Sequence, residues 1–257
     1  MMRNSWMPAV AALFLAIGSG SAAAAEGEIA LPHEEWSFNS IFGTYDEAAL
    51  KRGFQVYHDV CTACHSLNLV SYRHLSGIGL GEEEIKAVAA GVQVTDGPND
   101  EGEMFERAGL PSDRFKAPFP NEQAARAANN GAFPPDLSLM CKARIGGPDY
   151  VHAILTGYQE PPTGFQLNEG MNYNAYFAAG AHQIAMPPPL SDGAVTYADG
   201  TEATVPQMAL DVTNFLCWTA EPNLNQRHQM GVGVMLFLIV LTACLYAVYR
   251  KVWSGLH

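Results

Sequence analysis

The sequence predicts a mainly α-helical, loop-rich domain followed by one C-terminal membrane helix. Segments suited to helices are short and alternate with long Pro- and Gly-rich stretches, and no long alternation of apolar and polar residues indicates strands. A run of 20 apolar residues, 230–249, lies near the C-terminus. The length of 257 residues fits one large domain or two small ones.

The composition excludes several classes of protein. Asp and Glu (26) outnumber Lys and Arg (14), which gives a formal net charge of −12. A nucleic-acid-binding protein is therefore disfavoured, because it needs basic residues to neutralise phosphates. The 48% of hydrophobic residues can form a globular core, which argues against disorder. Five cysteines are too few for a small disulfide-framework protein.

The N-terminus has the order of a secretory signal peptide. Arg3 precedes an apolar run at residues 7–17, and a stretch of small residues that ends in Ala23, Ala24 and Ala25 then precedes Glu26, where cleavage is predicted. The apolar run is too short for a retained membrane anchor. A mitochondrial transit peptide would carry several Arg residues. Residues 1–25 are therefore predicted to be a cleaved bacterial signal peptide.

Five segments predict the helices of the domain: residues 45–60, 82–90, 121–129, 148–155 and 206–220. The last has the strongest pattern, because its apolar residues recur three and four positions apart until Glu221. The fourth has Pro148 in its first turn and Gly157 just past its end. Asp199 and Gly200 suit the tight turn at the tip of a hairpin.

The apolar run at residues 230–249 predicts a single membrane helix. At 1.5 Å per residue it is about 30 Å long, the thickness of the hydrocarbon core of a bilayer. Arg250 and Lys251 follow directly, and the positive-inside rule places them in the cytoplasm.

These segments predict the organisation of the chain: an exported domain at 26–227, an anchor at 228–250 and a cytoplasmic tail at 251–257. Residues 26–226 hold 10 of the 14 Lys and Arg and all 26 Asp and Glu, a formal net charge of −16. Such a surface favours a basic partner.

One motif carries chemistry: Cys61, Cys64 and His65 form the sequence C-x-x-C-H. This is the attachment sequence of haem c, in which two thiols bond to the haem vinyl groups and the adjacent histidine binds the iron. A zinc half-site would need a second cysteine pair, and a thioredoxin-type pair would need a βαβ pattern; the sequence has neither. One motif predicts one haem c.

A second axial ligand is expected downstream, and the exported domain offers these methionines: Met104, Met140, Met171, Met186 and Met208. Met186 is favoured, because the three prolines after it stiffen the loop that would hold it against the haem. His182 is the rival ligand. Met208 lies in the strongest helical segment, where a core role is expected.

Strings outside the haem motif match one family of haem proteins, and several of them are specific to it: residues 36–38 (WSF), 52–57 (RGFQVY), 130–138 (NGAFPPDLS), 142–144 (KAR), 155–158 (LTGY), 160–164 (EPPTG), 199–201 (DGT) and 218–222 (WTAEP). With these strings, the chain resembles the cytochrome c1 family, the haem subunits of cytochrome bc1 complexes, in its alphaproteobacterial type. The resemblance covers essentially the whole mature chain.

The resemblance implies a class I cytochrome c-like haem domain with long loop insertions, plus one transmembrane helix. It implies that His65 and Met186 are the axial ligands of the iron. It also implies that Arg144 pairs with a haem propionate, a carboxylate for which a guanidinium offers bidentate geometry. Tyr150 and Pro134 are expected to line the haem pocket.

Two features depart from the family pattern. Residues 178–183 form a slightly longer stretch than in mitochondrial members, and Cys141 and Cys217 are not general family residues. These two cysteines could form a disulfide in an oxidising compartment or stay as buried free thiols. We expect free thiols, because the sequence does not show that their α-carbons approach within bridging distance. Cys244 is expected to pack within the membrane segment.

The function implied by the resemblance is electron transfer. The haem would take electrons from a Rieske iron–sulfur protein and pass them to a soluble cytochrome c with a basic face, in respiration or photosynthesis. The chain would work with cytochrome b in a dimeric bc1 complex, as a redox subunit rather than an enzyme by itself. It would sit in the bacterial inner membrane through its C-terminal helix, with the haem domain in the periplasm.

Two alternatives remain open from the residues alone. One is a membrane-anchored cytochrome c that serves a terminal oxidase or another reductase. The other is a haem-based sensor or haem enzyme in which Met186 is not a ligand, because chemistry at iron needs an open position.

Overall fold

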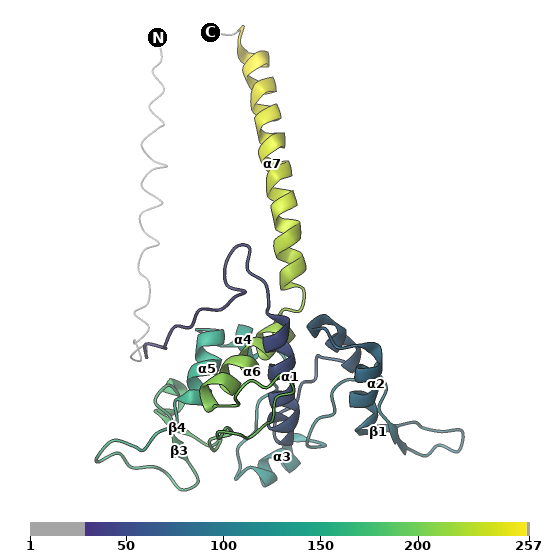
Figure 1. Ribbon diagram of the computed structural model, residues 1–257, viewed down its shortest axis with the longest axis vertical. Helices are drawn as coiled ribbons and strands as arrows, with labels where there is room; N and C mark the ends of the chain where they lie inside the picture. The colour runs from purple at the N-terminus through teal and green to yellow at the C-terminus, as the bar shows by residue number, and fades with distance from the viewer. Residues whose placement is uncertain (1–28, 256–257) are drawn as a thin grey trace, which may run out of the picture. The chain divides into compact units, whose positions relative to one another are not determined.

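Two helices, α1 (Glu47–Asp59) and α6 (Val205–Ala220), pack against each other at the centre of the fold (Figure 1). They agree with the helices predicted at 45–60 and 206–220. The computed structural model describes residues 29–255, so the predicted signal peptide at 1–25 lies outside the described residues.

Both helices begin with a side-chain cap. The Asp46 carboxylate accepts a hydrogen bond from the backbone N–H of Ala48, and the Thr204 side chain accepts one from that of Gln207. These bonds satisfy amide groups that a helix start leaves without partners. Pro206 fits the first turn of α6, where its missing N–H costs nothing.

Gly53 lets α1 and α6 approach closely. A Cβ atom at this position would lie 2.0 Å from the carbonyl oxygen of Asp211 and 2.8 Å from the Cβ of Phe215, so only glycine fits. Next to this contact, the Arg52 guanidinium donates two hydrogen bonds of 2.9 Å to the fully buried carboxylate of Asp211. A buried charge needs such a partner, and this pair fixes how the two helices meet.

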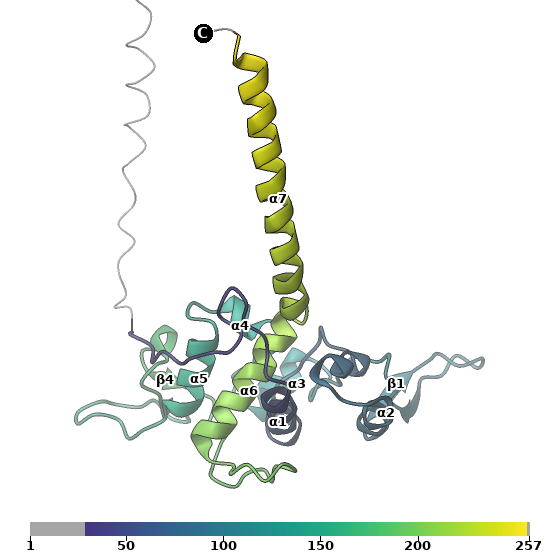
Figure 2. The ribbon, with the colours of Figure 1, turned by 45° about the horizontal axis from the view of Figure 1, so that its top comes forward.

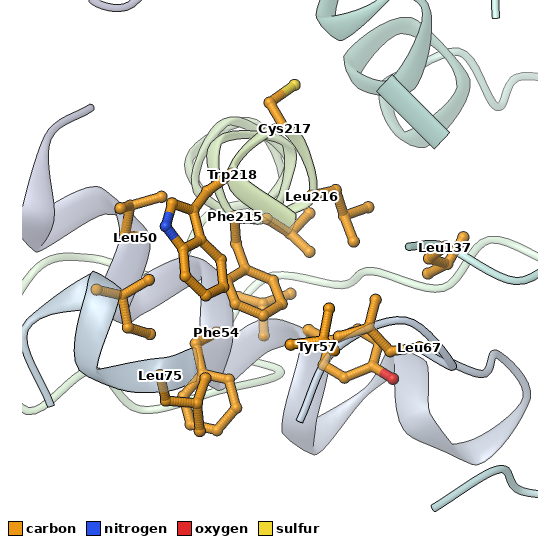
Figure 3. Packing of buried hydrophobic residues seen from close by; sticks show 14 of the residues in the cluster. Leu50, Phe54, Tyr57, Leu67, Leu75, Leu137, Phe215, Leu216, Cys217 and Trp218 are labelled. Carbon is orange, nitrogen blue, oxygen red and sulfur yellow. The ribbon is translucent and has the colours of Figure 1, made fainter. Parts of the chain in front are cut away.

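An aromatic cluster fills the core between the two helices (Figure 3). The ring of Phe215 lies 5.6 Å from those of Phe54 and Tyr57 and 5.7 Å from that of Trp218. Met208 is also fully buried here, as its place in the strongest helical segment predicts. The side chain of Cys217 points to the opposite side of α6.

The remaining helices and 3-10 helices lie around this pair. They are η1 (Cys61–Ala63), η2 (Tyr72–Ile78), α2 (Glu82–Ala90), α3 (Glu122–Ala128), α4 (Met140–Ala143), α5 (Pro148–Thr156), η3 (Ala178–Gly180) and α7 (Leu224–Trp253). Helices α2, α3 and α5 match the segments predicted at 82–90, 121–129 and 148–155. Helices α4 and α5 pack on α6.

The strands are short. Strand β1 (Gln93–Asp96) pairs antiparallel with β2 (Phe105–Ala108), and β3 (Asn172–Tyr173) pairs antiparallel with β4 (Gln183–Ile184). Four and two residues give too little alternation to be visible in the sequence.

The hairpin predicted at Asp199 and Gly200 is wrong. The chain turns there, but no strands flank the turn. The turn is held by side chains instead: the Asp199 carboxylate accepts hydrogen bonds from the backbone N–H of Thr201 and from Arg52, each of 2.9 Å.

The prediction of free thiols at Cys141 and Cys217 is also wrong, because the two form a disulfide. Cys141 lies in α4 and Cys217 in α6, on the face away from the aromatic cluster, with their α-carbons 5.1 Å apart. The packing of α4 on α6 creates this proximity between residues 76 positions apart, and no local pattern reveals it.

The predicted membrane helix is α7, which has 30 residues and leaves the domain from the end of α6 (Figure 2). It is long and apolar enough to cross a membrane, and its apolar side chains are exposed. It begins four residues before and ends three residues after the predicted span of 228–250.

Candidate haem site

The C-x-x-C-H motif forms a tight turn directly after α1. The backbone N–H groups of Cys64 and His65 both donate to the carbonyl oxygen of Cys61, over 3.2 and 2.9 Å. The hydroxyl of Thr62 donates to the carbonyl oxygen of His58 and ties the turn to the helix. Cys61 is half-buried, Cys64 is exposed, and both are free thiols. The turn therefore presents two thiols and one imidazole from a fixed backbone.

The imidazole of His65 is oriented by Pro135. Its Nδ1 lies 2.8 Å from the carbonyl oxygen of Pro135, and because a carbonyl can only accept, Nδ1 is the atom that carries the proton. Nε2 keeps its lone pair for a metal, the arrangement usual for a ligating histidine. Burial lowers the pKa of His65, which favours the neutral form that binds a metal.

Asp136 ties the segment that contains Pro135 to the residues that directly follow the C-x-x-C-H motif. Its carboxylate accepts hydrogen bonds from the hydroxyl of Ser66 (2.8 Å) and the backbone N–H of Asn68 (2.7 Å). The backbone N–H of Leu137 donates to the carbonyl oxygen of Ser66 over 2.9 Å. Pro134, predicted to line the pocket, is half-buried on this same segment. Pro134 and Pro135 are thus held beside the motif.

Large apolar side chains stay exposed on the stretches of chain next to His65, Pro135 and Arg144. They are Leu69, Phe133, Leu139 and Ile145. Ile145 is 91% exposed, which is unusual for an isoleucine in a domain with a well-formed core. Two free thiols and an oriented imidazole are the groups that a covalently bound haem requires, and exposed apolar side chains suit its hydrophobic ring, so these residues fit haem c.

Met186 lies on a loop that is fixed at this residue. Its carbonyl oxygen accepts hydrogen bonds from the hydroxyl of Tyr158 (3.0 Å) and the side-chain amide of Asn172 (3.4 Å). Burial raises the pKa of Tyr158, so its hydroxyl stays protonated and donates. The Met186 side chain is half-buried, and no hydrogen bond in the described part of the chain joins its loop to the His65 turn.

The rival ligands have different surroundings. His182 has a left-handed backbone (φ 66°), its ring stacks on Tyr173, and its Nδ1 lies 3.3 Å from the carbonyl oxygen of Asn174. Met104 is exposed between β1 and β2, and Met208 is buried in the core.

Arg144 and Tyr150 lie on either side of a glycine-rich turn. Arg144 is exposed at the end of α4, and within residues 29–255 its guanidinium makes one hydrogen bond, of 3.5 Å, to the neighbouring carbonyl of Ala143. Its charge is therefore available to a propionate. Tyr150 is half-buried in α5 and packs against the core.

Sequence reasoning missed the residues that hold the ligands rather than provide them. Asp136, Tyr158 and Asn172 bond to backbone groups next to His65 and Met186. Asp136 lies in the family string 130–138 and Tyr158 in the string 155–158. Their place in these strings was the only sequence feature that could have pointed to a role beside the predicted ligands.

The chain matches one protein family and is similar to several known proteins. A family profile described as "Cytochrome C1 family" matches residues 36–256. The chain is 52% identical to "Cytochrome c1 1, heme protein, mitochondrial" of Arabidopsis thaliana over 237 residues, which cover 92% of this chain and 76% of the relative. It is 47% identical to "Cytochrome c1" of Rhodospirillum rubrum, over 95% of this chain and 94% of the relative. It is 46% identical to "Cytochrome b/c1" of Bradyrhizobium diazoefficiens, over 96% of this chain and 39% of that protein.

Proposed function

We propose that His65 and Met186 are the two axial iron ligands of this chain, which belongs to the cytochrome c1 family. As a member of that family, it is an electron-transfer haem subunit of a cytochrome bc1 complex. The observation that carries the proposal for His65 is the hydrogen bond from its Nδ1 to the carbonyl oxygen of Pro135, which leaves Nε2 available. The proposal for Met186 rests on the family resemblance and on the three prolines that follow it. Bound haem c supplies one-electron chemistry by cycling between ferrous and ferric iron.

The residues of this chain hold and tune that group. The thiols of Cys61 and Cys64 would attach it covalently, and Arg144 would pair with a propionate. Tyr150 and Pro134 would line its pocket. The carbonyl oxygen of Met186 is held by Tyr158 and Asn172, which keeps the ligand loop in place. Two filled axial positions suit an electron carrier rather than a haem enzyme, which needs an open one.

The electron donor is proposed to be a Rieske iron–sulfur protein and the acceptor a soluble cytochrome c with a basic face. The net charge of −16 over residues 26–226 supports a basic acceptor. Not every acid is available: Asp96 pairs with Arg107, and Lys86 pairs with Glu82 and Glu83. The loop between β1 and β2 keeps exposed acids with no basic partner among the described residues, namely Asp100, Glu101 and Glu103.

The chain is proposed to be the alphaproteobacterial type, placed in the bacterial inner membrane with its haem domain in the periplasm. Arg250 and Lys251 at the end of α7 support a cytoplasmic C-terminus by the positive-inside rule. The proposed organisation is a signal peptide at 1–25, a haem domain at 26–227, an anchor at 228–250 and a tail at 251–257. The match to the Rhodospirillum rubrum protein supports a bacterial origin, alongside the mitochondrial relatives.

Cytochrome b is proposed as the partner of α7 within a dimeric complex. The relative from Bradyrhizobium diazoefficiens is named for both b and c1, which supports this pairing. Affinity purification of the tagged chain from detergent-solubilised membranes tests it. Recovery with a two-haem b cytochrome and an iron–sulfur subunit is expected. Recovery with a terminal oxidase alone would instead favour a membrane-anchored cytochrome c that delivers electrons to that oxidase.

A further inference from the structure

The loop between Phe38 and Tyr45 presents two apolar side chains to the outside. Ile41 is 80% and Phe42 is 74% exposed, although the loop is closed at its base. There Phe38 and Tyr45 are buried, with their rings 4.9 Å apart, and Gly43 donates its N–H to the carbonyl oxygen of Ser40. The loop is therefore fixed on the core while its tip exposes apolar surface.

Gly43 makes this geometry possible. A Cβ atom there would lie 2.5 Å from the carbonyl oxygen of Ser37 and 2.8 Å from the backbone of Phe38, so a side chain would open the base of the loop. The hydroxyl of Ser37 also donates to the carbonyl oxygen of Thr44 over 2.8 Å. The base of the loop that carries Ile41 and Phe42 is thus fixed by the fold.

The same loop is bonded to the first turns of the membrane helix. The imidazole Nδ1 of His228 lies 2.7 Å from the carbonyl oxygen of Gly43, and the side chain of Asn225 accepts a hydrogen bond of 3.0 Å from the backbone N–H of Tyr45. His228 stands two residues before the apolar run that begins at Met230. Figure 1 shows the segment before α1 rising beside the base of α7.

We propose that Ile41 and Phe42 insert into the bilayer interface next to α7 and form a second membrane contact of the domain. The contact with His228 places the loop tip at the level where the apolar part of α7 begins, so it continues the membrane-facing surface of that helix. Residues 39–44 contain no charged side chain, in a domain with a net charge of −16. Apolar side chains at such an interface reach about 5–10 Å into the boundary of headgroups and acyl chains.

Two contacts restrict the domain more than one does. A single helix allows the domain to rotate about the helix axis and to tilt. The loop touches the bilayer beside that axis and opposes tilting, so it would orient the haem domain relative to the membrane. This inference does not depend on the identity of the axial ligands or of the electron-transfer partners.

Site-directed spin labelling of the haem-loaded full chain in phosphatidylcholine liposomes tests the proposal. Phe42→Cys carries the nitroxide in a Cys244→Ser background, and Leu167→Cys, an apolar position between α5 and β3 that is 37% exposed, is the control. Collision rates with oxygen, which concentrates in the bilayer, and with a water-soluble nickel complex are measured. The label at position 42 is expected to collide more with oxygen and less with nickel than the control label, and Ile41→Cys should behave the same way.

Two results would overturn the proposal. Equal collision profiles at positions 42 and 167 would mean that the loop tip stays in water. A label at 42 that is open to nickel in liposomes but shielded from both reagents in the intact complex would mean that another subunit covers the loop. A native haem spectrum shows that each labelled chain is folded.

Discussion

The imidazole of His65 donates its Nδ1 proton to the carbonyl oxygen of Pro135 across 2.8 Å, and this bond connects two segments 70 residues apart. It fixes both the tautomer and the ring plane of His65, the proposed proximal ligand, without the help of a metal. The hydrogen bonds of Asp136 keep the Pro135 segment in place, so the orientation of His65 depends on Asp136 as well as on Pro135.

Replacing Asp136 with Asn should destabilise the domain at neutral pH. Burial raises the pKa of Asp136, but its hydrogen bonds lower it by more, so the pKa lies below the ordinary value. Because the pKa of Asp136 is lower in the folded chain than in the unfolded chain, the ionised carboxylate stabilises the fold. This stabilisation is fully present above the pKa of the unfolded chain, about 3.9, and is lost as the pH falls through the pKa of the folded chain. Urea unfolding should show a cost of about 1 kcal/mol at pH 7, because hydrogen bonds to a partly buried carboxylate are weakened or lost.

This cost should shrink as the pH falls below the ordinary Asp range, because the native carboxylate then becomes protonated too. Asp46→Asn is a control, since asparagine caps a helix as well as aspartate does. A stability difference between the native chain and the Asp136→Asn variant that stays constant down to about pH 3 would argue against this linkage.

Removing the disulfide should lower stability without changing the haem spectrum. The bond joins residues 76 positions apart, and closing a loop of this length lowers the entropy of the unfolded chain by an amount worth about 4 kcal/mol. The double variant Cys141→Ala, Cys217→Ala should therefore unfold about 10 °C lower. Thermal unfolding by circular dichroism checks this, with Cys244→Ala as the control. An unchanged midpoint would show that the bond does not form in the native protein.

The disulfide also shows where sequence reasoning stops. Helices α1, α2, α3, α5, α6 and α7 were predictable, because each has local capping residues or a periodic apolar pattern. The Cys141–Cys217 bond depends on α4, which has four residues and no such pattern, packing on α6.

In the haem site, too, some residues are predictable from local sequence and others only from tertiary structure. Cys61, Cys64 and His65 are predictable because covalent haem attachment fixes their spacing. Met186 was favoured only through its prolines and the family resemblance. The bonds that hold it, from Tyr158 and Asn172, come from segments 28 and 14 residues away and follow from tertiary structure.

A stop codon after Asn225 should release a soluble haem domain into the periplasm. The truncation removes α7 almost entirely but keeps Asn225, whose side chain accepts from Tyr45, and every residue of the haem site. Fractionation should show the domain in the periplasmic extract with a near-native haem spectrum. Its association with cytochrome b should be lost, because α7 provides the contacts within the membrane. A truncated chain that stays in salt-washed membranes lacking cytochrome b would mean that α7 is not the anchor on which membrane attachment depends.

Neutralising the acidic loop should weaken the salt dependence of electron transfer to a soluble basic cytochrome c. Asp100, Glu101, Glu103 and Glu106 are exposed on and beside the loop between β1 and β2. Attraction between charged surfaces acts mainly on the association rate and is screened over about 8–10 Å at physiological salt. Changing all four to Asn or Gln should flatten the fall of the second-order rate with ionic strength.

The same variant should leave the haem potential unchanged. Neutralising the ion-paired acids Glu82 and Glu83 on α2 is the comparison, and it should have the smaller effect. A native salt dependence in the quadruple variant would place the docking surface elsewhere on the domain.

The reduction potential and carbon monoxide reactivity of Met186→Leu test the proposed iron ligation most directly. Leucine keeps the volume of methionine but lacks the thioether, which favours ferrous iron, so the potential should fall. A tenfold loss of this preference corresponds to about 59 mV, and we expect a fall of at least that size. The sulfur-to-iron charge-transfer band should vanish and carbon monoxide should bind, whereas Met171→Leu should leave all three properties native. A Met186→Leu chain with native potential, native band and no carbon monoxide binding would contradict the ligand assignment and direct attention to His182.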